Sequence, residues 1–379
     1  MNVSSSASHQ KRACILETTC ILVLGCVLVA GLWPFHAPRN DVSWSGNGIF
    51  LGRHGSLISS GVFEAPTAAG GNPCSLEVWL APNRIDSAGT ILSFYQPTTN
   101  SIPFSLRQSL GDLVVQRVSP NLTPRKSKLY VDVFHDLKPV FVTITSGPTG
   151  LNVYVDANRV RRSSGPLFSS QNLTGQLIIG NAPTTTDSWS GQLLGFAIYD
   201  QELSPADVSL HYQEWMQGRT RTSSDTDIFR ARYRFDEGKG SIAHNESGSA
   251  PDLGIPERFF VLREPFLERP WNEFHPDRAY CKDVAINIFG LIPLGFFFNA
   301  YLSIVKKTKR ATGLTIVLGF VTSLTIEILQ SFLPTRDSGT TDLFTNTLGT
   351  AIGAVLFVWS MKRGWFGRFG FPSTLLSKT

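Results

Sequence analysis

Four long apolar segments constrain this chain more than any other feature of its sequence. They cover residues 13–35, 283–305, 311–334 and 342–360. Each is close to the roughly 20 residues that a helix needs to cross a bilayer at about 1.5 Å per residue. Charged residues make up 17% of the chain, below the roughly 25% that is usual for a soluble domain. We therefore predict a bundle of four transmembrane helices.

Basic residues beside these segments predict their orientation. The ends that we assign to the cytoplasm carry Lys11, Arg12, Lys306, Lys307, Lys309, Arg310, Lys362, Arg363 and Arg368, and the opposite ends carry Arg39, Arg278, Lys282 and Arg336. Because cytoplasmic flanks are enriched in Lys and Arg, residues 1–12 and 361–379 are expected in the cytoplasm and residues 36–282 outside. This placement in a cell membrane accounts for much of the net charge of +5, so we expect no nucleic-acid partner.

The first apolar segment also allows a second interpretation, as a cleaved signal peptide. Val23–Cys26 loosely matches a lipoprotein cleavage site, but the apolar run continues to Trp33, which favours an uncleaved helix. Cys74 and Cys281 both fall in the predicted outer region, where a disulfide could survive. The sequence leaves their pairing open.

Residues 46–222 are predicted to form an antiparallel β-sandwich. Runs such as 75–80, 140–145 and 151–156 alternate between apolar and polar residues, and Gly, Pro, Asn and Asp separate them. A helix is expected to begin at Ser204, with Pro205 in its first turn. Trp79 and Trp189 are predicted to pack in the core.

The sandwich region resembles a laminin G-like, concanavalin A-like jelly-roll domain. The resemblance depends on the order of SLEVWL, the strand pair FVTITSGPTGLNVYVDANRV, LIIGNAP, and the closing block WSGQLLGFAIYDQELSPADVSLHY. It implies binding of a glycan or protein, and in some members of calcium. No acidic cluster here has a trustworthy calcium pattern, so we predict no metal or other cofactor, with calcium as the open alternative. Residues 223–282 are expected to connect this domain to the second helix, with an extra strand pair.

Polar residues recur at one depth of the predicted helices. Segment three carries Glu327 and Gln330 on one face, and segment four carries Asp342 and Asn346. Asp283 and Asn287 begin segment two, and Arg336 and Asp337 lie in the loop between segments three and four. Ionisable residues in a membrane are costly and face a bundle interior or a site. Two interpretations stay open: a network that joins the helices, or a polar pocket in which Glu327, Asp342 or Asp283 is catalytic and Arg336 binds an anion.

These segments resemble the VanZ-like family. The matching motifs are DVAINIFGLIPLGF in residues 283–296, EILQSFLPTRD in 327–337 and DLFTNTLG in 342–349. The resemblance implies a bacterial membrane protein with a laminin G-like domain inserted in its first outer loop, from a family linked to teicoplanin resistance. No established reaction comes with it.

The sequence supports three functions of different classes. The first is an envelope protein whose outer domain binds a glycan or protein, with an involvement in the glycopeptide response. The second is a membrane-embedded enzyme that acts on a lipid or lipid-linked envelope precursor through the cluster around Glu327. The third is a transporter or channel, which four helices would form only as an oligomer. Whether the chain is an enzyme is left undecided.

Overall fold

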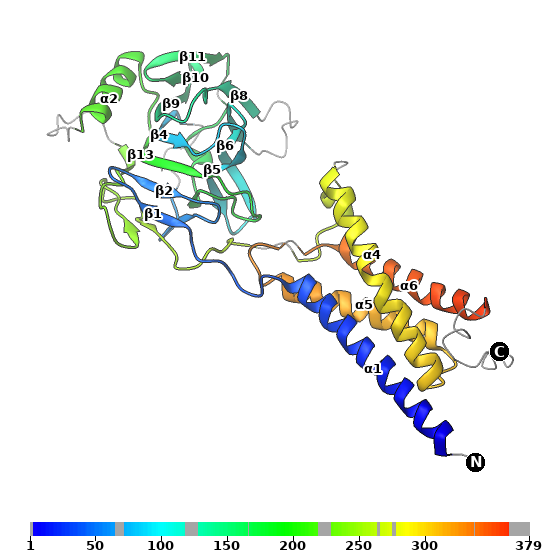
Figure 1. The fold of residues 1–379 in the computed structure, drawn as a ribbon. Helices are drawn as coiled ribbons and strands as arrows, with labels where there is room; N and C mark the ends of the chain where they lie inside the picture. Colours follow the sequence, from blue (N-terminus) through cyan, green and yellow to red (C-terminus); the bar gives the residue numbers. More distant parts are fainter. Residues whose placement is uncertain are drawn as a thin grey trace. The chain divides into compact units, whose positions relative to one another are not determined.

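The computed structural model describes residues 3–64, 72–117, 128–165, 167–218, 229–263, 266–274, 278–336 and 338–363. The chain divides into two compact units (Figure 1). The membrane unit comprises Met1–His36 and Glu264–Thr379, and the outer unit, named for the side of the membrane that the sequence predicts, comprises Ala37–Arg263. The insertion of one unit into the other agrees with the prediction of a mixed, multidomain chain.

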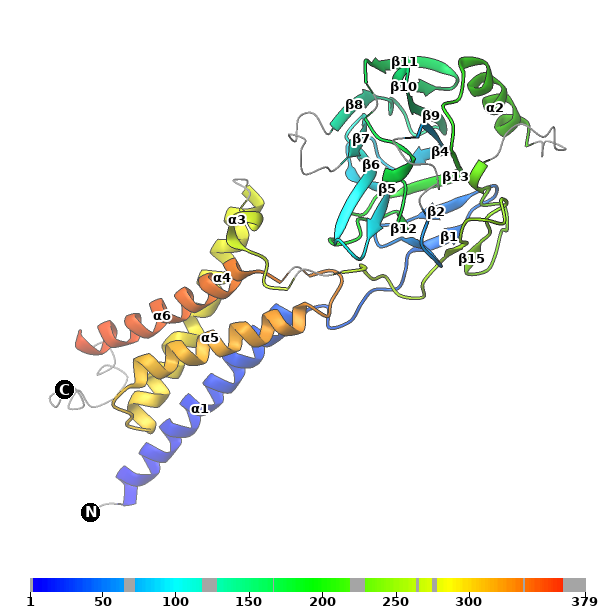
Figure 2. The same ribbon diagram turned by 180° about the vertical axis from the view of Figure 1, so that it is seen from behind.

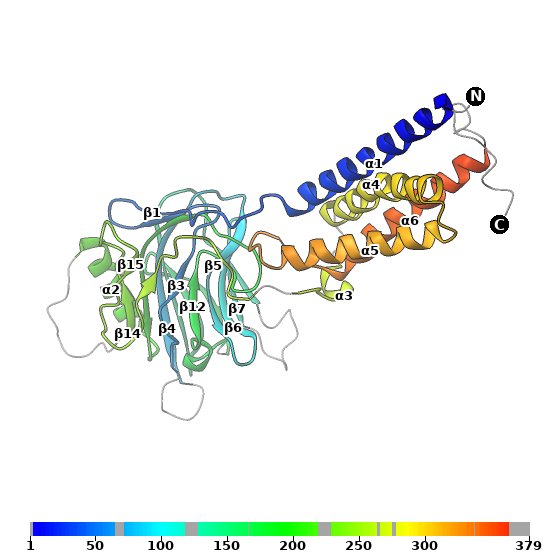
Figure 3. The ribbon, with the colours of Figure 1, turned by 90° about the horizontal axis from the view of Figure 1, so that it is seen from below.

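Among its described residues, the membrane unit contains four long helices and one short helix, α3 (Pro270–Glu273). The long helices are α1 (Val3–Leu32), α4 (Arg278–Ala300), α5 (Ala311–Gln330) and α6 (Thr340–Lys362), and a π-helical stretch, Tyr301–Val305, extends α4. The spans Gln10–Leu32, Tyr280–Val305, Ala311–Gln330 and Thr340–Lys362 are long and apolar enough to cross a membrane. The long helices lie side by side (Figures 1 and 3).

Small residues bring α4 and α6 into close contact. A Cβ atom on Gly349 would lie 2.2 Å from the carbonyl oxygen of Ile288, and one on Gly353 would lie 2.0 Å from that of Ile292. Gly295 of α4 meets the backbone of Thr350 in the same way, at 1.9 Å. Backbones that approach this closely are typical of transmembrane helices packed through small residues.

The outer unit is a sandwich of two eight-stranded sheets, as the alternating pattern predicted. Within the described residues, the pairs between its strands are antiparallel. The first sheet has the order β1 (Val42–Trp44), β2 (Ile49–Leu51), β13 (Gly191–Tyr199), β4 (Cys74–Pro82), β9 (Val140–Gly147), β10 (Gly150–Val155) and β11 (Asn158–Ser163), with β14 (Phe229–Tyr233) also paired to β13. The second sheet has the order β15 (Ile242–Ala243), β16 (Leu253–Gly254), β3 (Leu57–Ser59), β12 (Gln176–Ile179), β5 (Ala88–Gln96), β6 (Ser101–Ser109), β7 (Asp112–Arg117) and β8 (Lys128–Asp132).

The sandwich extends further along the chain than residues 46–222. Strands β14, β15 and β16 come from the stretch 223–282 that was assigned to a connector, and they complete both sheets. Ala231, Tyr233 and Leu253 are buried in the common core, so burial of their side chains holds these strands in place. The extra strands expected in this stretch thus pair with the sandwich itself.

Alternation along each strand separates the core from the outer faces. On β5, Leu92 and Phe94 point into the core between the sheets, whereas Ser93 and Tyr95 belong to the opposite face. Trp189 is buried in the same core, as predicted. Helix α2 (Pro205–Gln217) covers the outer face of the first sheet, and its buried face packs against β4, β9 and β13.

Candidate functional site

The outer face of the second sheet carries a polar cavity of about 330 Å³. Strands β5, β6 and β7, which lie next to one another in Figure 2, supply its floor. Their outward positions contribute Thr90, Ser93, Ser105, Arg107 and Gln116, and the loop 182–187 forms one wall. The alternation of side chains along these strands thus places a row of polar side chains beneath this loop.

Asp187 organises this cavity. Its carboxylate accepts a hydrogen bond from the Thr90 hydroxyl at 2.5 Å and one from the Arg107 guanidinium at 3.1 Å. The loop is held from below, because the side-chain oxygen of Asn181 accepts the Asp187 backbone N–H at 2.9 Å. The Arg107–Asp187 ion pair balances the charges of the cavity, so a neutral polar ligand fits it better than an ion.

Ser93 supplies an unused polar atom at the cavity floor. Its side chain is fully buried, and its hydroxyl has no hydrogen-bond partner among the described residues. A buried polar group without a partner costs free energy, on the order of 1–3 kcal/mol. A ligand hydroxyl at this position would remove that cost.

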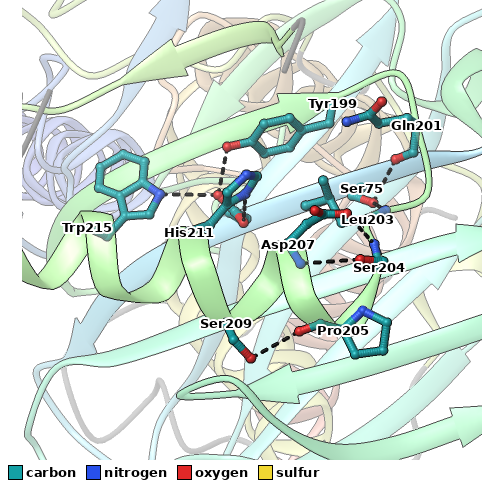
Figure 4. Close-up of polar contacts among 11 residues, drawn as sticks. Ser75, Tyr199, Gln201, Leu203, Ser204, Pro205, Asp207, Ser209, His211 and Trp215 are labelled. Carbon is teal, nitrogen blue, oxygen red and sulfur yellow. Dashed lines mark hydrogen bonds and ion pairs between the residues drawn. The ribbon is translucent and has the colours of Figure 1, made fainter. Parts of the chain in front are cut away.

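A second cluster of polar side chains in the outer unit is buried beneath α2 (Figure 4). The carboxylate of Glu77, which is 0% exposed, accepts hydrogen bonds from the Tyr199 hydroxyl at 2.9 Å and the Trp215 indole at 3.1 Å. Nδ1 of His211 lies 2.8 Å from the same carboxylate. Because these contacts run between β4, β13 and α2, the group joins α2 to the sheet.

The start of α2 follows the prediction. The hydroxyl of Ser204 accepts the backbone N–H of Asp207, and the Asp207 carboxylate accepts the N–H of Ser204 (Figure 4). Pro205 occupies the first helical turn. This reciprocal cap fixes where the helix begins and hence the depth at which His211 enters the sandwich.

In the membrane unit, the side chain of Glu327 in α5 contacts the start of α6. Its carboxylate, in a side chain that is 1% exposed, accepts the backbone N–H of Gly339 at 2.9 Å. Gly339 is the N-cap residue of α6, so this carboxylate lies at the positive end of the helix dipole. Asp342, in the first turn of the same helix, accepts a hydrogen bond from the Asn287 amide at 2.7 Å.

The other predicted polar residues connect different pairs of helices. The Gln330 amide donates to the carbonyl oxygen of Gly31 in α1 at 2.8 Å, and the Asn346 amide donates to the Ser323 hydroxyl at 3.0 Å. Arg336 donates from Nε and Nη2 to the carbonyl oxygen of Trp33, at 3.0 and 2.6 Å. These contacts join α1, α4, α5 and α6, which favours the network interpretation over the pocket.

Two further residues were predicted for this cluster. Asp283 is exposed on α4, and Asp337 lies outside the described residues. The side-chain oxygens of Gln330 and Asn346 are buried and lack hydrogen-bond partners among the described residues.

Comparison with protein families matches two separate stretches of the chain. Residues 234–361 match the model described as VanZ/LLP1, and residues 59–209 match that of the concanavalin A-like lectin/glucanases superfamily. The chain combines a VanZ-like region with a laminin G-like domain. Both resemblances seen in the sequence are thereby confirmed.

Solved structures are similar to part of the chain. A Bacteroides ovatus protein proposed to bind carbohydrate is 13% identical, with a TM-score of 0.39, and the match covers 58% of this chain and 60% of that one. The ligand-binding domain of botulinum neurotoxin serotype D, in complex with N-acetylneuraminic acid, is 18% identical, with a TM-score of 0.35 and coverage of 47% and 45%. The chain thus spans 60% or less of these structures. No curated protein matches it.

Within the part of the chain that the structure describes, no three His, Cys, Asp or Glu side chains form a group that could hold a metal ion. The cysteines Cys74 and Cys281 are both free thiols, Cys74 buried and Cys281 exposed.

The sequence did not single out Thr90, Ser93, Arg107 or Asp187. These residues are far apart in the chain, and only the antiparallel register, which places Thr90 opposite Arg107, brings them together. The one signal available was the run of Thr before Asp187, which is typical of a loop and carries no chemistry by itself.

Proposed function

We propose that this chain is a multi-pass protein of a bacterial cell envelope whose laminin G-like domain binds a glycan in the Asp187 cavity. One observation carries the proposal: the fully buried Ser93 hydroxyl and the Arg107–Asp187 ion pair lie in the same cavity, and this hydroxyl has no hydrogen-bond partner among the described residues. A sugar presents several hydroxyls, each of which donates and accepts. Sugar hydroxyls can therefore donate to the Asp187 carboxylate and accept from the Arg107 guanidinium, so neither charged group is buried without a partner.

The orientation proposed for this function keeps both termini in the cytoplasm and residues 36–282 outside. It is supported by the excess of Lys and Arg at the cytoplasmic ends of the segments. The laminin G-like domain would then meet wall or surface glycans, and the VanZ-like region would anchor it in the bilayer. The same assignment leads us to expect a change in teicoplanin susceptibility when the gene is deleted.

The alternative of a membrane-embedded enzyme requires the Glu327 carboxylate to meet a lipid-linked precursor. The contact of that carboxylate with Gly339, together with its burial, favours a role in holding α6 instead. We therefore place the glycan-binding function first. The enzyme remains an alternative, to be tested by comparing the cellular phenotype of Glu327→Gln with that of wild type at equal protein levels.

The glycan proposal is tested with the full chain in lipid nanodiscs on an array of bacterial wall fragments and neutral oligosaccharides. We expect saturable binding that Asp187→Asn weakens at least tenfold. Ser93→Ala is the milder variant, because it removes a hydroxyl that makes no hydrogen bond within the described protein, and it should weaken binding severalfold without lowering the Tm. Asp86→Asn, at an exposed carboxylate outside the cavity, is the matched control. Binding that is equal in all four proteins would contradict the assignment of this cavity.

A further inference from the structure

The outer unit has a second cavity, of about 290 Å³, on the opposite side of the sandwich. It lies on the outer face of the first sheet, beside the C-terminal end of α2, whereas the Asp187 cavity lies on the outer face of the second sheet. Its walls include Trp79, Leu194, Glu214, Arg232, Arg234 and Asp236. The hydrophobic core separates the two cavities, so they are independent sites.

An aromatic wall distinguishes this second cavity. Trp189 is buried, as predicted, whereas Trp79 is partly exposed and packs against the apolar cluster beneath α2. The ring of Trp79 meets that of Trp215 edge to face, with 6.5 Å between centroids. Trp215 is in turn fixed by the hydrogen bond of its indole to Glu77. The exposed side of Trp79 is therefore part of a rigid apolar surface.

The polar wall of the cavity is equally well ordered. The Arg232 guanidinium lies 4.9 Å from the centroid of the Trp215 ring, and its side chain is 11% exposed. Glu246 contacts both arginines, at 3.5 Å for Arg232 and 2.9 Å for Arg234. Since Glu214 and Asp236 add further carboxylates, the positive charge of the arginines is compensated. An anionic ligand has no excess of positive charge to bind here.

From this geometry we infer that the second cavity binds a neutral pyranose ring. A pyranose has an apolar C–H face, which fits the exposed side of Trp79, and a rim of hydroxyls, which fits donors from Arg232 and Arg234 and acceptors from Glu214 and Asp236. The inference extends the proposed function, because it gives the domain two sugar sites on opposite faces. Two such sites would hold two different glycan chains, and their simultaneous use raises the overall affinity without new contacts.

The test is calorimetric titration of the full chain in nanodiscs with cellobiose and N,N′-diacetylchitobiose as probes. We expect two sugars per chain in the wild type and one in Trp79→Ala, with the affinity of the second cavity lowered at least tenfold. Trp79→Phe retains an apolar ring and should keep partial binding, and its Tm reports whether the sheet is intact. Trp44→Phe, on the same sheet but outside both cavities, is the matched control and should retain two sites.

Each outcome separates the second cavity from the first. The inference is supported if adding Trp79→Ala to Asp187→Asn removes one sugar site. This holds whether Asp187→Asn alone retains two sites or one. A single wild-type site that Asp187→Asn abolishes overturns the inference and leaves the proposed function intact. Wild-type stoichiometry in Trp79→Ala also overturns the inference. Binding of neither probe to any of the proteins overturns the inference for neutral pyranoses altogether.

Discussion

The Glu327 carboxylate of α5 accepts the backbone N–H of Gly339, the N-cap residue of α6, at 2.9 Å. A buried carboxylate from one helix thus occupies the position that a capping side chain of α6 would otherwise take. The partial positive charge at the N-terminus of α6 compensates the negative charge in an apolar unit. This contact explains structurally why an apolar helix such as α5 carries a carboxylate at Glu327.

Loss of the Glu327 charge should destabilise the membrane unit. We expect Glu327→Gln, which retains an acceptor, to cost about 0.5–1 kcal/mol, and Glu327→Leu, which removes it, to cost about 1–2 kcal/mol. Thermal unfolding in detergent measures both, and Glu17→Gln, at an exposed carboxylate of α1, is the control. A Glu327→Leu protein as stable as wild type would rule out the capping role.

Close packing of α4 and α6 makes Gly353 intolerant of a side chain. The Cβ of an alanine there would lie 2.0 Å from the carbonyl oxygen of Ile292, so the helices must separate. We expect Gly353→Ala to cost about 1–3 kcal/mol, as overpacking does. Gly290 of α4 has no neighbouring atom within 4 Å of such a Cβ, so Gly290→Ala is the matched control and should keep or raise the Tm.

The buried Glu77 should be essential for attaching α2 to the sandwich. Glu77→Leu removes the acceptor that the donors of Tyr199 and Trp215 share and should lower the free energy of unfolding by about 3–5 kcal/mol. Tyr199→Phe removes one donor only and should cost about 1 kcal/mol. Urea unfolding followed by Trp fluorescence gives both values. If the two variants lost stability equally, the carboxylate would not be the centre of this network.

Native cysteines allow the proposed orientation to be tested directly. Cys281 is exposed at the start of α4, whereas Cys74 is buried, and burial raises the pKa of its thiol to about 12. A membrane-impermeant maleimide added to intact cells should therefore label Cys281, and Cys281→Ser should abolish that labelling. Labelling of Cys281 only after the cells are broken open would place residues 36–282 in the cytoplasm.

Much of the fold could be predicted because its patterns are local. Apolar length identifies the helices, and alternation identifies strands such as β4, β9 and β10. The sandwich boundary could not be found in this way, because β15 and β16 are two residues long and have no period of their own. Pairing of β16 with β3, and of β15 with β16, defines them.

The sequence indicated one of the two candidate sites but not the other. The membrane cluster was visible because a residue such as Glu327 is rare in an apolar segment. Its contact with Gly339, however, depends on how α5 turns back into α6. The Asp187 cavity was invisible because Thr and Ser on a strand look like any solvent-facing positions. Only the sheet register shows that Thr90 lies beside Arg107 and beneath Asp187.

The most direct test of the glycan-binding account is an experimental structure of the full chain with a saccharide selected from the array. The account predicts that sugar hydroxyls lie within hydrogen-bond distance of the Asp187 carboxylate and the Ser93 hydroxyl, over strands β5–β7. A saccharide bound elsewhere, with the Asp187 cavity holding only solvent at saturating sugar, would contradict it.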